Sequence, residues 1–219
     1  MIPTALSKNN IRHQITSPAG AVRKGLARKS SFIFIREFLR HPCQVGSLLP
    51  SSPRLAEAML EGISLLPGER ILELGPGTGS FTDQIYRIIR DKRMYLGIEK
   101  GGAFVGLLRE RFPDLTFVTG AAEEFDGRAG PALFPAIKAI ISGLPYTAIG
   151  ESSLDRLVEN LERLMFPGSL FRTFTYLHSY HLAGPAHFRR RMEKITSRYL
   201  RSRVILKNLP PAYVLTWFR

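Results

Sequence analysis

Two alternating hydrophobic patterns divide the chain from residue 68 onward. Short runs rich in branched and aromatic side chains are separated by longer stretches with the apolar spacing of helices. The short runs predict β-strands and the longer stretches predict α-helices. Because strands that alternate with helices at this spacing pair in parallel, the pattern predicts an α/β fold with a doubly wound sheet. Strands are expected at 70–74, 94–98, 115–119, 137–141 and 169–175, and helices at 80–90, 103–111, 151–164 and 185–196.

The last part of the chain departs from this alternation. Two strand-like runs, 201–207 and 213–218, flank the residues Asn-Leu-Pro-Pro at 208–211. Two strands that are joined by so short a link pair antiparallel. We therefore expect an antiparallel hairpin at the C-terminal end of the domain.

The N-terminal part has no strand pattern. Residues 1–21 show no periodicity and are expected to be a flexible lead-in. Between 22 and 40, apolar residues such as Phe32 and Phe38 share one side of a helical wheel, and Arg36 and Arg40 share the other. An imperfect amphipathic helix of this kind either packs on the main domain or lies in a bilayer interface. The expected organisation is a lead-in at 1–21, a helical membrane-contact and cofactor-lid segment at 22–66, and a main domain at 67–219.

Composition narrows the class of protein. The 219 residues are 44% hydrophobic, which suffices for one sizeable core. No run approaches the 18 or so consecutive apolar residues of a membrane-spanning helix, and no secretory signal pattern is evident. The single cysteine, Cys43, forms no internal disulfide and gives no metal-ligand spacing. These features predict an intracellular protein without a bound metal.

The net charge of +13 is concentrated at the two ends of the chain. Residues 1–40 carry +7 and residues 187–219 carry +8, whereas the middle carries −2. A nearly neutral body with basic ends predicts contact with a polyanion, either anionic lipid headgroups or a nucleic-acid backbone. Charge alone does not choose between them.

The strongest motif is Glu-Leu-Gly-Pro-Gly-Thr-Gly at 73–79, where the first predicted strand gives way to a helix. Glycines at such a turn let the backbone approach a bound ligand closely. Glu99 follows at the end of the second strand, where a carboxylate can accept both hydroxyls of a ribose. The third glycine of a dinucleotide site comes three residues after the second, but Gly79 comes only two after Gly77. The motif therefore favours a nucleoside ligand other than NAD.

This motif resembles motif I of the S-adenosylmethionine-dependent methyltransferases. The resemblance implies a class I, Rossmann-like, seven-stranded sheet whose last strand inserts antiparallel, with S-adenosylmethionine as cofactor and S-adenosylhomocysteine as product. It places Gly75, Gly77 and Gly79 against the methionine part of the cofactor and Glu99 on the ribose. The segment 120–123 then contacts the adenine.

Three further patches narrow the resemblance. Ribosomal RNA adenine dimethylases usually carry Asn-Leu-Pro-Tyr after the fourth strand, whereas this chain has Gly-Leu-Pro-Tyr at 143–146 and lacks the side-chain amide that would hold adenine. That loop, together with Pro-Cys-Gln-Val-Gly-Ser-Leu-Leu-Pro-Ser-Ser-Pro-Arg-Leu-Ala at 42–56 and Asn-Leu-Pro-Pro-Ala at 208–212, resembles the bacterial phospholipid N-methyltransferases. The resemblance to this family implies that Ser51 and Ser52 close over the cofactor. A helix cap before 54–62 is a second role for these serines.

The resemblance and the strand positions together give the expected site. Tyr146 is expected to pack on the charge that develops on an attacking amine, and Tyr176 and His178 to orient the amine or accept its proton. Arg36, Arg40 and the arginines at 189–191 are candidates for lipid phosphate. The expected cofactor contacts are Ser51, Ser52, Glu73, Gly75, Gly77, Thr78, Gly79, Glu99, Lys100, Ala122, Glu123, Ser142, Gly143 and Leu144.

The function implied by the resemblance is methylation of a membrane lipid. We expect a peripheral membrane enzyme, on the inner face of the cell membrane, that methylates the amino headgroup of phosphatidylethanolamine towards phosphatidylcholine. The expected partners are an anionic membrane surface and the aminophospholipid, without nucleic acid or a stable protein partner. Three alternatives stay open: a ribosomal RNA adenine N6-methyltransferase, an N-methyltransferase of another aminolipid such as ornithine lipid, and a cofactor-binding module without catalysis.

Overall fold

The computed structural model describes residues 51–125 and 137–219, which all belong to one unit of the chain, His41–Arg219. The lead-in at 1–21, the amphipathic helix at 22–40 and Cys43 lie outside the described residues. The strands are β1 (Arg70–Leu74), β2 (Tyr95–Glu99), β3 (Thr116–Thr119), β4 (Ile137–Ser142), β5 (Leu170–Tyr176), β6 (Arg198–Arg201) and β7 (Ala212–Phe218). The α-helices are α3 (Pro53–Leu60), α4 (Ser80–Ile88), α5 (Gly102–Arg111), α6 (Glu151–Leu164) and α7 (Ala183–Ile195), and the 3-10 turns are η2 (Lys92–Met94), η3 (Ala122–Glu124) and η4 (Leu177–Ser179).

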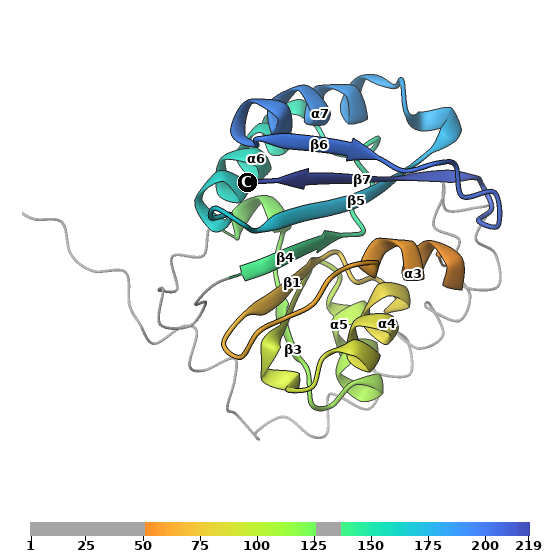
Figure 1. The fold of residues 1–219 in the computed structure, drawn as a ribbon. Coiled ribbons are helices and arrows are strands. Elements are labelled where there is room, and N and C mark those ends of the chain that lie inside the picture. The colour runs from red at the N-terminus through yellow and green to blue at the C-terminus, as the bar shows by residue number, and fades with distance from the viewer. Residues whose placement is uncertain (1–50, 126–136) are drawn as a thin grey trace, which may run out of the picture. The chain divides into compact units, whose positions relative to one another are not determined.

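The seven strands form one sheet in the order β3-β2-β1-β4-β5-β7-β6 (Figure 1). Strands β1 to β5 run parallel, and β7 inserts between β5 and β6, antiparallel to both. The predicted doubly wound sheet and its antiparallel insertion are therefore confirmed. The strand order reverses between β1 and β4, and in sheets of this kind ligands bind outside the carboxyl ends of the strands at that point.

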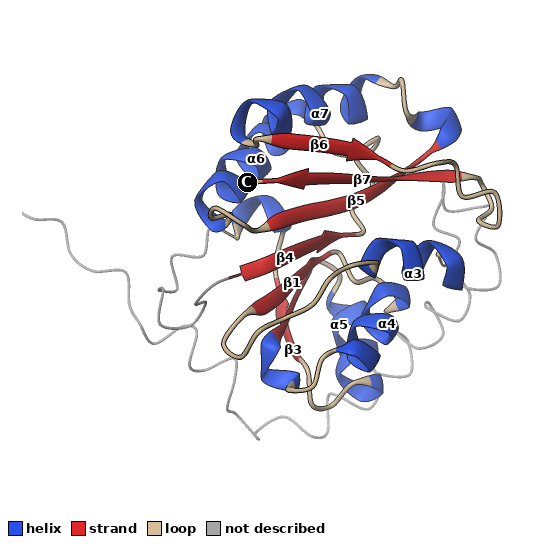
Figure 2. Ribbon diagram, in the orientation of Figure 1, coloured by secondary structure: helices blue, strands red, loops and turns tan. Residues whose placement is uncertain are grey.

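Helices cover both faces of the sheet (Figure 2). Strands buried on both faces read as nearly continuous apolar runs, which is why β1 and β4 could be located from the sequence. Ile71 points into the core beneath α3, α4 and α5, and its neighbour Leu72 points into the core beneath α6 and α7. Trp217 of β7 is fully buried and packs against Phe171 and Phe188 in this second core.

The predicted range of the first strand in the C-terminal hairpin is wrong. The strand β6 ends at Arg201, so most of the run 201–207 belongs to the connection 202–211. The ladder ends because the side-chain hydroxyl of Ser202, in place of a backbone carbonyl, accepts the next hydrogen bond from the Val214 amide at 2.9 Å. Beyond it, Ile205 makes only an isolated bridge to Ala212.

Helix α3 is bonded to the sheet at its C-terminal end. Proline begins the helix after Ser52, a favoured arrangement because the first helical N–H has no partner in the helix. At the other end, the Arg172 guanidinium of β5 donates to the carbonyls of Met59 and Glu61 at 3.2 and 2.8 Å. The last turn of α3 is thereby held against β5.

A tight backbone approach at the start of α7 generates a prediction about stability. A Cβ atom at Gly184 would lie 2.3 Å from the Tyr146 carbonyl oxygen, whereas one at Gly106 in α5 would meet nothing within 4 Å. Gly184→Ala should lower the free energy of unfolding by about 1–3 kcal/mol because the backbones must separate. Gly106→Ala should raise it by about 0.5–1 kcal/mol through its better helix propensity. Urea unfolding followed by circular dichroism measures both, and equal effects of the two substitutions would contradict this account.

Candidate functional site

The glycine loop that follows β1 is built from left-handed backbone. Gly75 and Gly77 have φ of +69° and +58°, a region that residues with a side chain rarely adopt. The Gly75 amide donates to the Ile98 carbonyl of β2 at 2.9 Å, which anchors the start of the loop. A side chain at Gly77 would meet no protein atom within 4 Å, so the backbone there borders open space. The loop therefore leaves room for a ligand against its own main chain.

Glu99, at the end of β2, is bonded to this loop. Its Oε2 accepts the Gly77 amide at 3.0 Å, and its Oε1 accepts the Gly101 amide at 2.8 Å. Each carboxylate oxygen has a second lone pair, which can accept a ribose hydroxyl. Glu99 thus holds the loop and keeps acceptor capacity for the ligand.

Glu73 lies fully buried beneath the loop, in a hydrogen-bond network that the sequence analysis missed. Its Oε2 accepts the hydroxyls of Tyr95 and Thr82 at 2.6 and 2.8 Å, while its Oε1 has no partner. Burial raises the pKa of Glu73 to about 7, against the lowering effect of the two hydroxyl donors. Burial and the neighbouring Glu73 likewise raise the pKa of Tyr95.

The Tyr95 hydroxyl reaches Glu73 because the opposite position carries no side chain. Gly97 is paired with Glu73 in the parallel register of β1 and β2. A Cβ at Gly97 would lie 2.6 Å from the Tyr95 hydroxyl. In the sequence, this network is marked only by Tyr-Leu-Gly at 95–97. That pattern can be interpreted only when the register between β1 and β2 is known.

The predicted adenine-contact segment follows β3 beside Glu99. The Gly120 amide donates to the Glu99 carbonyl at 3.0 Å, and Ala122 is buried. The Glu123 carbonyl accepts the Asn160 side-chain amide of α6 at 2.8 Å. Thr78 has its carbonyl bonded by Arg111, and Lys100 is exposed after Glu99. The structure therefore brings this segment to the glycine loop, but it shows no contact that distinguishes Thr78 or Lys100.

The loop after β4 packs directly on the glycine loop. The Gly143 amide donates to the Leu74 carbonyl at 2.8 Å, and a Cβ at Gly143 would lie 2.7 Å from the Gly75 carbonyl oxygen. This contact explains why glycine stands at 143, because any side chain would force the two loops apart. Leu144 covers Gly75, since a Cβ there would lie 2.9 Å from Leu144 Cδ2.

Tyr146 is buried in the core beneath this loop. Its hydroxyl is 2.7 Å from the Ser142 hydroxyl, and its ring packs on Phe188 with centroids 4.3 Å apart. Burial raises the pKa of Tyr146. The Ser142 hydroxyl also accepts the Leu144 amide at 3.3 Å. Tyr146 and Ser142 therefore fix the course of the loop.

A cavity of about 230 Å³ lies between this loop, the end of β5 and the start of α7. Tyr176 and His178 line it, and their rings are stacked with centroids 5.7 Å apart and an interplanar angle of 9°. Partial burial raises the pKa of Tyr176. Among the described residues, no carboxylate, lysine or arginine lines the cavity. Its other walls include Gly143, Leu144, Tyr146, Phe174, Leu182 and Pro185.

Two of the patches that suggested the phospholipid N-methyltransferases are bonded to each other. The Ser52 amide donates to Asn208 Oδ1 at 3.0 Å, and the Ser52 hydroxyl caps α3 by accepting the Leu55 amide at 3.1 Å. Asn208 is buried and donates from Nδ2 to the Pro210 carbonyl at 2.7 Å. Sequence reasoning missed this positioning role of Asn208, although a buried amide beside two prolines that lack an N–H was a usable signal. The segment with Ser51 and Ser52 is thereby attached to the last loop of the domain.

The described residues suit a nucleoside cofactor and offer no metal site. The open space along Gly77, the carboxylate of Glu99 and the unpartnered Glu73 Oε1 lie together at one end of the strands. Within 51–125 and 137–219 there is no cluster of three metal-ligating side chains. No helix in those ranges has the length and apolar character needed to cross a membrane.

Buried Glu73 should make stability depend on pH. Between pH 4.5 and about 7 the unfolded chain releases this proton while the folded chain keeps it, so the free energy of unfolding should fall as pH rises. The total fall is about 3 kcal/mol at 1.36 kcal/mol per pKa unit. Glu73→Gln, which stays neutral, should remove this slope, and Glu193→Gln on the surface of α7 should retain it. Urea unfolding between pH 4 and 8 measures the slope, and an unchanged slope in Glu73→Gln would refute the assignment.

Glu99→Ala should weaken S-adenosylmethionine binding without unfolding the chain. Hydrogen bonds to a charged group contribute about 1.5–3 kcal/mol, which corresponds to roughly 10- to 100-fold in the dissociation constant. Titration calorimetry measures the affinity, and far-ultraviolet circular dichroism checks the fold. Glu193→Ala is the control and should bind as the unmodified protein does. Equal affinities for all three proteins would show that Glu99 does not contact the cofactor.

Comparison with known proteins agrees with this geometry. An ornithine lipid N-methyltransferase of Singulisphaera acidiphila is 25% identical over 187 residues, which span 84% of this chain and 93% of that protein. A probable ribosomal RNA small subunit methyltransferase A of Methanosarcina mazei is 31% identical over 98 residues, 43% of this chain and 32% of that protein.

Solved structures share the fold at low sequence identity. A TehB-like SAM-dependent methyltransferase from Corynebacterium glutamicum matches with a TM-score of 0.57 and 10% identity over 87% of this chain and 98% of its own. The N-methyltransferase NodS from Bradyrhizobium japonicum matches with a TM-score of 0.56 and 11% identity over 76% and 93%. The sequence also matches the family described as Protein-L-isoaspartate(D-aspartate) O-methyltransferase (PCMT) over residues 36–187. With its glycine loop, its Glu99 and its inserted antiparallel strand, the chain belongs to this family and is a class I methyltransferase that uses S-adenosylmethionine and releases S-adenosylhomocysteine.

Proposed function

We propose that the protein methylates the primary amine of a membrane aminolipid. The observation that carries the proposal is the uncharged, aromatic cavity that shares Gly143 and Leu144 with the wall of the glycine loop. An acceptor in this cavity would be separated from the glycine loop only by Gly143 and Leu144. The ornithine lipid N-methyltransferase, which matches over nearly its whole length, supports an aminolipid as acceptor.

The chemistry requires an amine without its proton. When bound, S-adenosylmethionine would supply an electrophilic methyl group on its sulfonium. The nitrogen lone pair would form the new C–N bond as the C–S bond breaks, with its electron pair leaving on the sulfur of S-adenosylhomocysteine. Deprotonating a lysine-like ammonium costs about 4–5 kcal/mol at neutral pH. The lining formed by the part of the chain that the structure describes contains no carboxylate to stabilise an ammonium, and desolvation favours the neutral amine. The apolar walls therefore reduce the free energy needed to deprotonate the ammonium.

Tyr176 and His178 are the residues that we assign to act on the amine. Both line the cavity at the end of β5, so a hydroxyl and an imidazole border the acceptor. The imidazole of His178 can accept the proton that the amine releases. The ring of Tyr176 can face the positive charge that develops on nitrogen, a contact worth about 2 kcal/mol when desolvated. We assign Tyr146 a positioning role, because its ring and hydroxyl are engaged with Phe188 and Ser142.

Phosphatidylethanolamine is our first candidate acceptor and ornithine lipid is the second. Both carry a primary amine a few bonds away from an anionic group. Phosphatidylethanolamine follows from the motif resemblance at 42–56, 143–146 and 208–212, and ornithine lipid follows from the Singulisphaera relative. The basic ends of the chain favour peripheral attachment to an anionic inner membrane face.

A labelling experiment tests the proposal. Purified full-length protein is incubated with S-adenosylmethionine labelled in its methyl group and anionic vesicles that contain phosphatidylethanolamine, ornithine lipid or neither. Label is expected in an aminolipid headgroup, and chromatography gives the number of methyl groups transferred. Ribosomal RNA and an isoaspartyl peptide serve as competing acceptors. Label in either of these and none in lipid would overturn the proposal, and cofactor binding without transfer to any acceptor would indicate a non-catalytic module.

A further inference from the structure

Exposed leucines gather at the carboxyl edge of the sheet. In 51–125 and 137–219, four of the seven exposed large hydrophobic side chains lie on two neighbouring loops there. We call these four the leucine rim: Leu177 and Leu182 flank the turn after β5, and Leu206 and Leu209 lie in the connection 202–211. Single exposed leucines are ordinary, but a gathering beside a cavity indicates an interaction surface.

The two loops are joined to each other and to the cavity. The Leu177 amide donates to the Pro211 carbonyl at 2.8 Å, which connects the turn after β5 with the connection 202–211. Leu182 lines the cavity, and Leu177 directly precedes the lining residue His178. Leu182 therefore lies at the cavity itself, and the bond from Leu177 to Pro211 connects its turn with the loop that carries Leu206 and Leu209.

The exposed side chains of the connection 202–211 are held in place. Leu206 and Leu209 are 75% and 77% exposed. Between them, buried Asn208 bonds to the Pro210 carbonyl and to the Ser52 amide. Because this backbone is already fixed, insertion of the two leucines into a partner would cost little ordering entropy.

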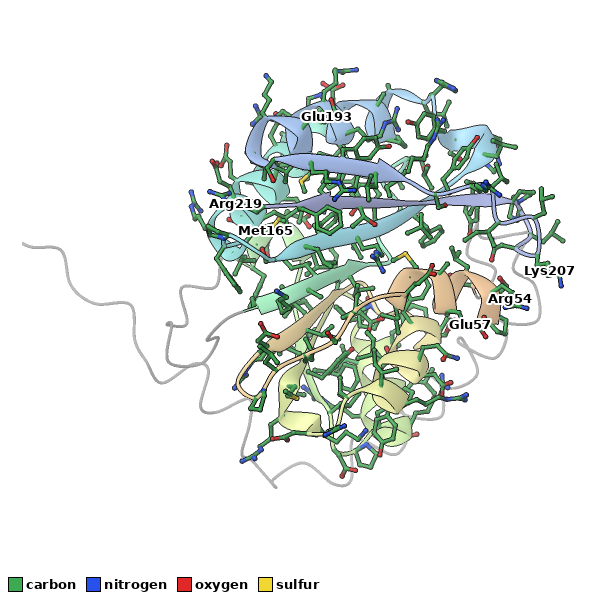
Figure 3. All side chains as sticks on the ribbon, viewed as in Figure 1. Arg54, Glu57, Met165, Glu193, Lys207 and Arg219 are labelled. Carbon is green, nitrogen blue, oxygen red and sulfur yellow. The ribbon has the colours of Figure 1, made fainter. Side chains whose placement is uncertain are left out.

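The charge around the rim complements an anionic surface. Arg203 and Lys207 are exposed in the same connection, and residues 163–219 contain a single acidic side chain, Glu193 on α7. From the side of α3, the acids Glu57 and Glu61 and the cation Arg54 line a hollow with Leu206 and Lys207. Figure 3 places Lys207 at the end of the molecule where α3 presents Arg54, whose charge is paired with Glu57. Leucines flanked by cations are the composition of interfacial membrane anchors. A nucleic-acid backbone would account for the cations but not for two leucines more than 70% exposed.

We propose that the leucine rim, with Arg203 and Lys207, docks this edge of the domain on an anionic lipid bilayer. The leucines enter the boundary between headgroups and acyl chains, and the cations contact lipid phosphates. The cavity then opens toward the headgroup layer. The docking itself needs no catalysis, but its purpose as the entry route of an aminolipid rests on the proposed function.

A fluorescent reporter tests the contact locally, whatever the rest of the chain contributes to membrane binding. The chain has one tryptophan, Trp217, which is fully buried and gives a constant background. Leu209→Trp is compared with Leu66→Trp, whose leucine is 68% exposed among residues at the amino ends of β1 and β2. With vesicles of phosphatidylglycerol and brominated phosphatidylcholine, emission of Leu209→Trp should be quenched and that of Leu66→Trp should not. Equal behaviour of the two reporters would overturn the proposal.

A paired substitution tests the contribution to affinity. Leu206→Glu combined with Leu209→Glu should lower the partition coefficient onto these vesicles roughly tenfold, because two apolar anchors are lost and two anions are added. Leu66→Glu is the matched control and should sediment with vesicles as the unmodified protein does. Sedimentation of the double variant at the unmodified level would contradict docking through the rim.

The same variants separate this inference from the proposed function. On vesicles with phosphatidylethanolamine or ornithine lipid, the double variant should transfer methyl groups more slowly, and on a short-chain aminolipid dispersed in detergent it should match the unmodified protein. Equal methylation rates on vesicles would overturn docking through the leucine rim and leave the proposed function intact. Quenching of Leu209→Trp without methylation of any lipid would overturn the function and leave the rim intact.

Discussion

The packing of two backbones at the centre of the sheet is the constraint on which the site depends. The Gly75 carbonyl oxygen lies where a side chain at 143 would begin, and the Gly143 amide is bonded to the Leu74 carbonyl. Reacting groups must come within about 3–3.5 Å of each other for methyl transfer. With no side chain between the two loops, Gly143 and Leu144 both contact the glycine loop and line the cavity proposed for the acceptor. This contact requires glycine at 143, whereas glycine at 75 is required by its φ of +69° and by the approach of Leu144.

Beneath that contact, electrostatics and packing are linked through β1 and β2. Glu99 bonds to the Gly77 amide of the glycine loop, whereas Glu73 bonds to Thr82 in the helix α4 that follows the loop, so two carboxyl groups of different character fix this part of the chain. Glu73 is fully buried, and the absent side chain of Gly97 admits the hydroxyl of Tyr95 to it.

The sequence predicted most of this architecture because its signals are local. Buried parallel strands have continuous apolar runs, and Gly75, Gly77 and Glu99 are recognised by their places at strand ends. Contacts that need the register or the loop path were missed, namely Tyr95 with Glu73 and Asn208 with Ser52. The end of β6 was misplaced because Val204 and Ile205 have strand propensity, whereas a serine hydroxyl terminates the ladder. The burial of the Tyr146 ring likewise follows from Phe188, forty-two residues away in the chain.

The bond between Ser52 and Asn208 has a consequence for how the protein matures during synthesis. It joins residues 156 positions apart, and Asn208 lies within the last twelve residues of this chain. A ribosome releases the N-terminal serine segment long before the asparagine that secures it, and contacts of such long range form late because loop closure must precede them. Strand β7, which follows at once, has to enter between β5 and β6 at the same stage. The attachment of the serine segment is therefore completed only after the connection 202–211 has been synthesised.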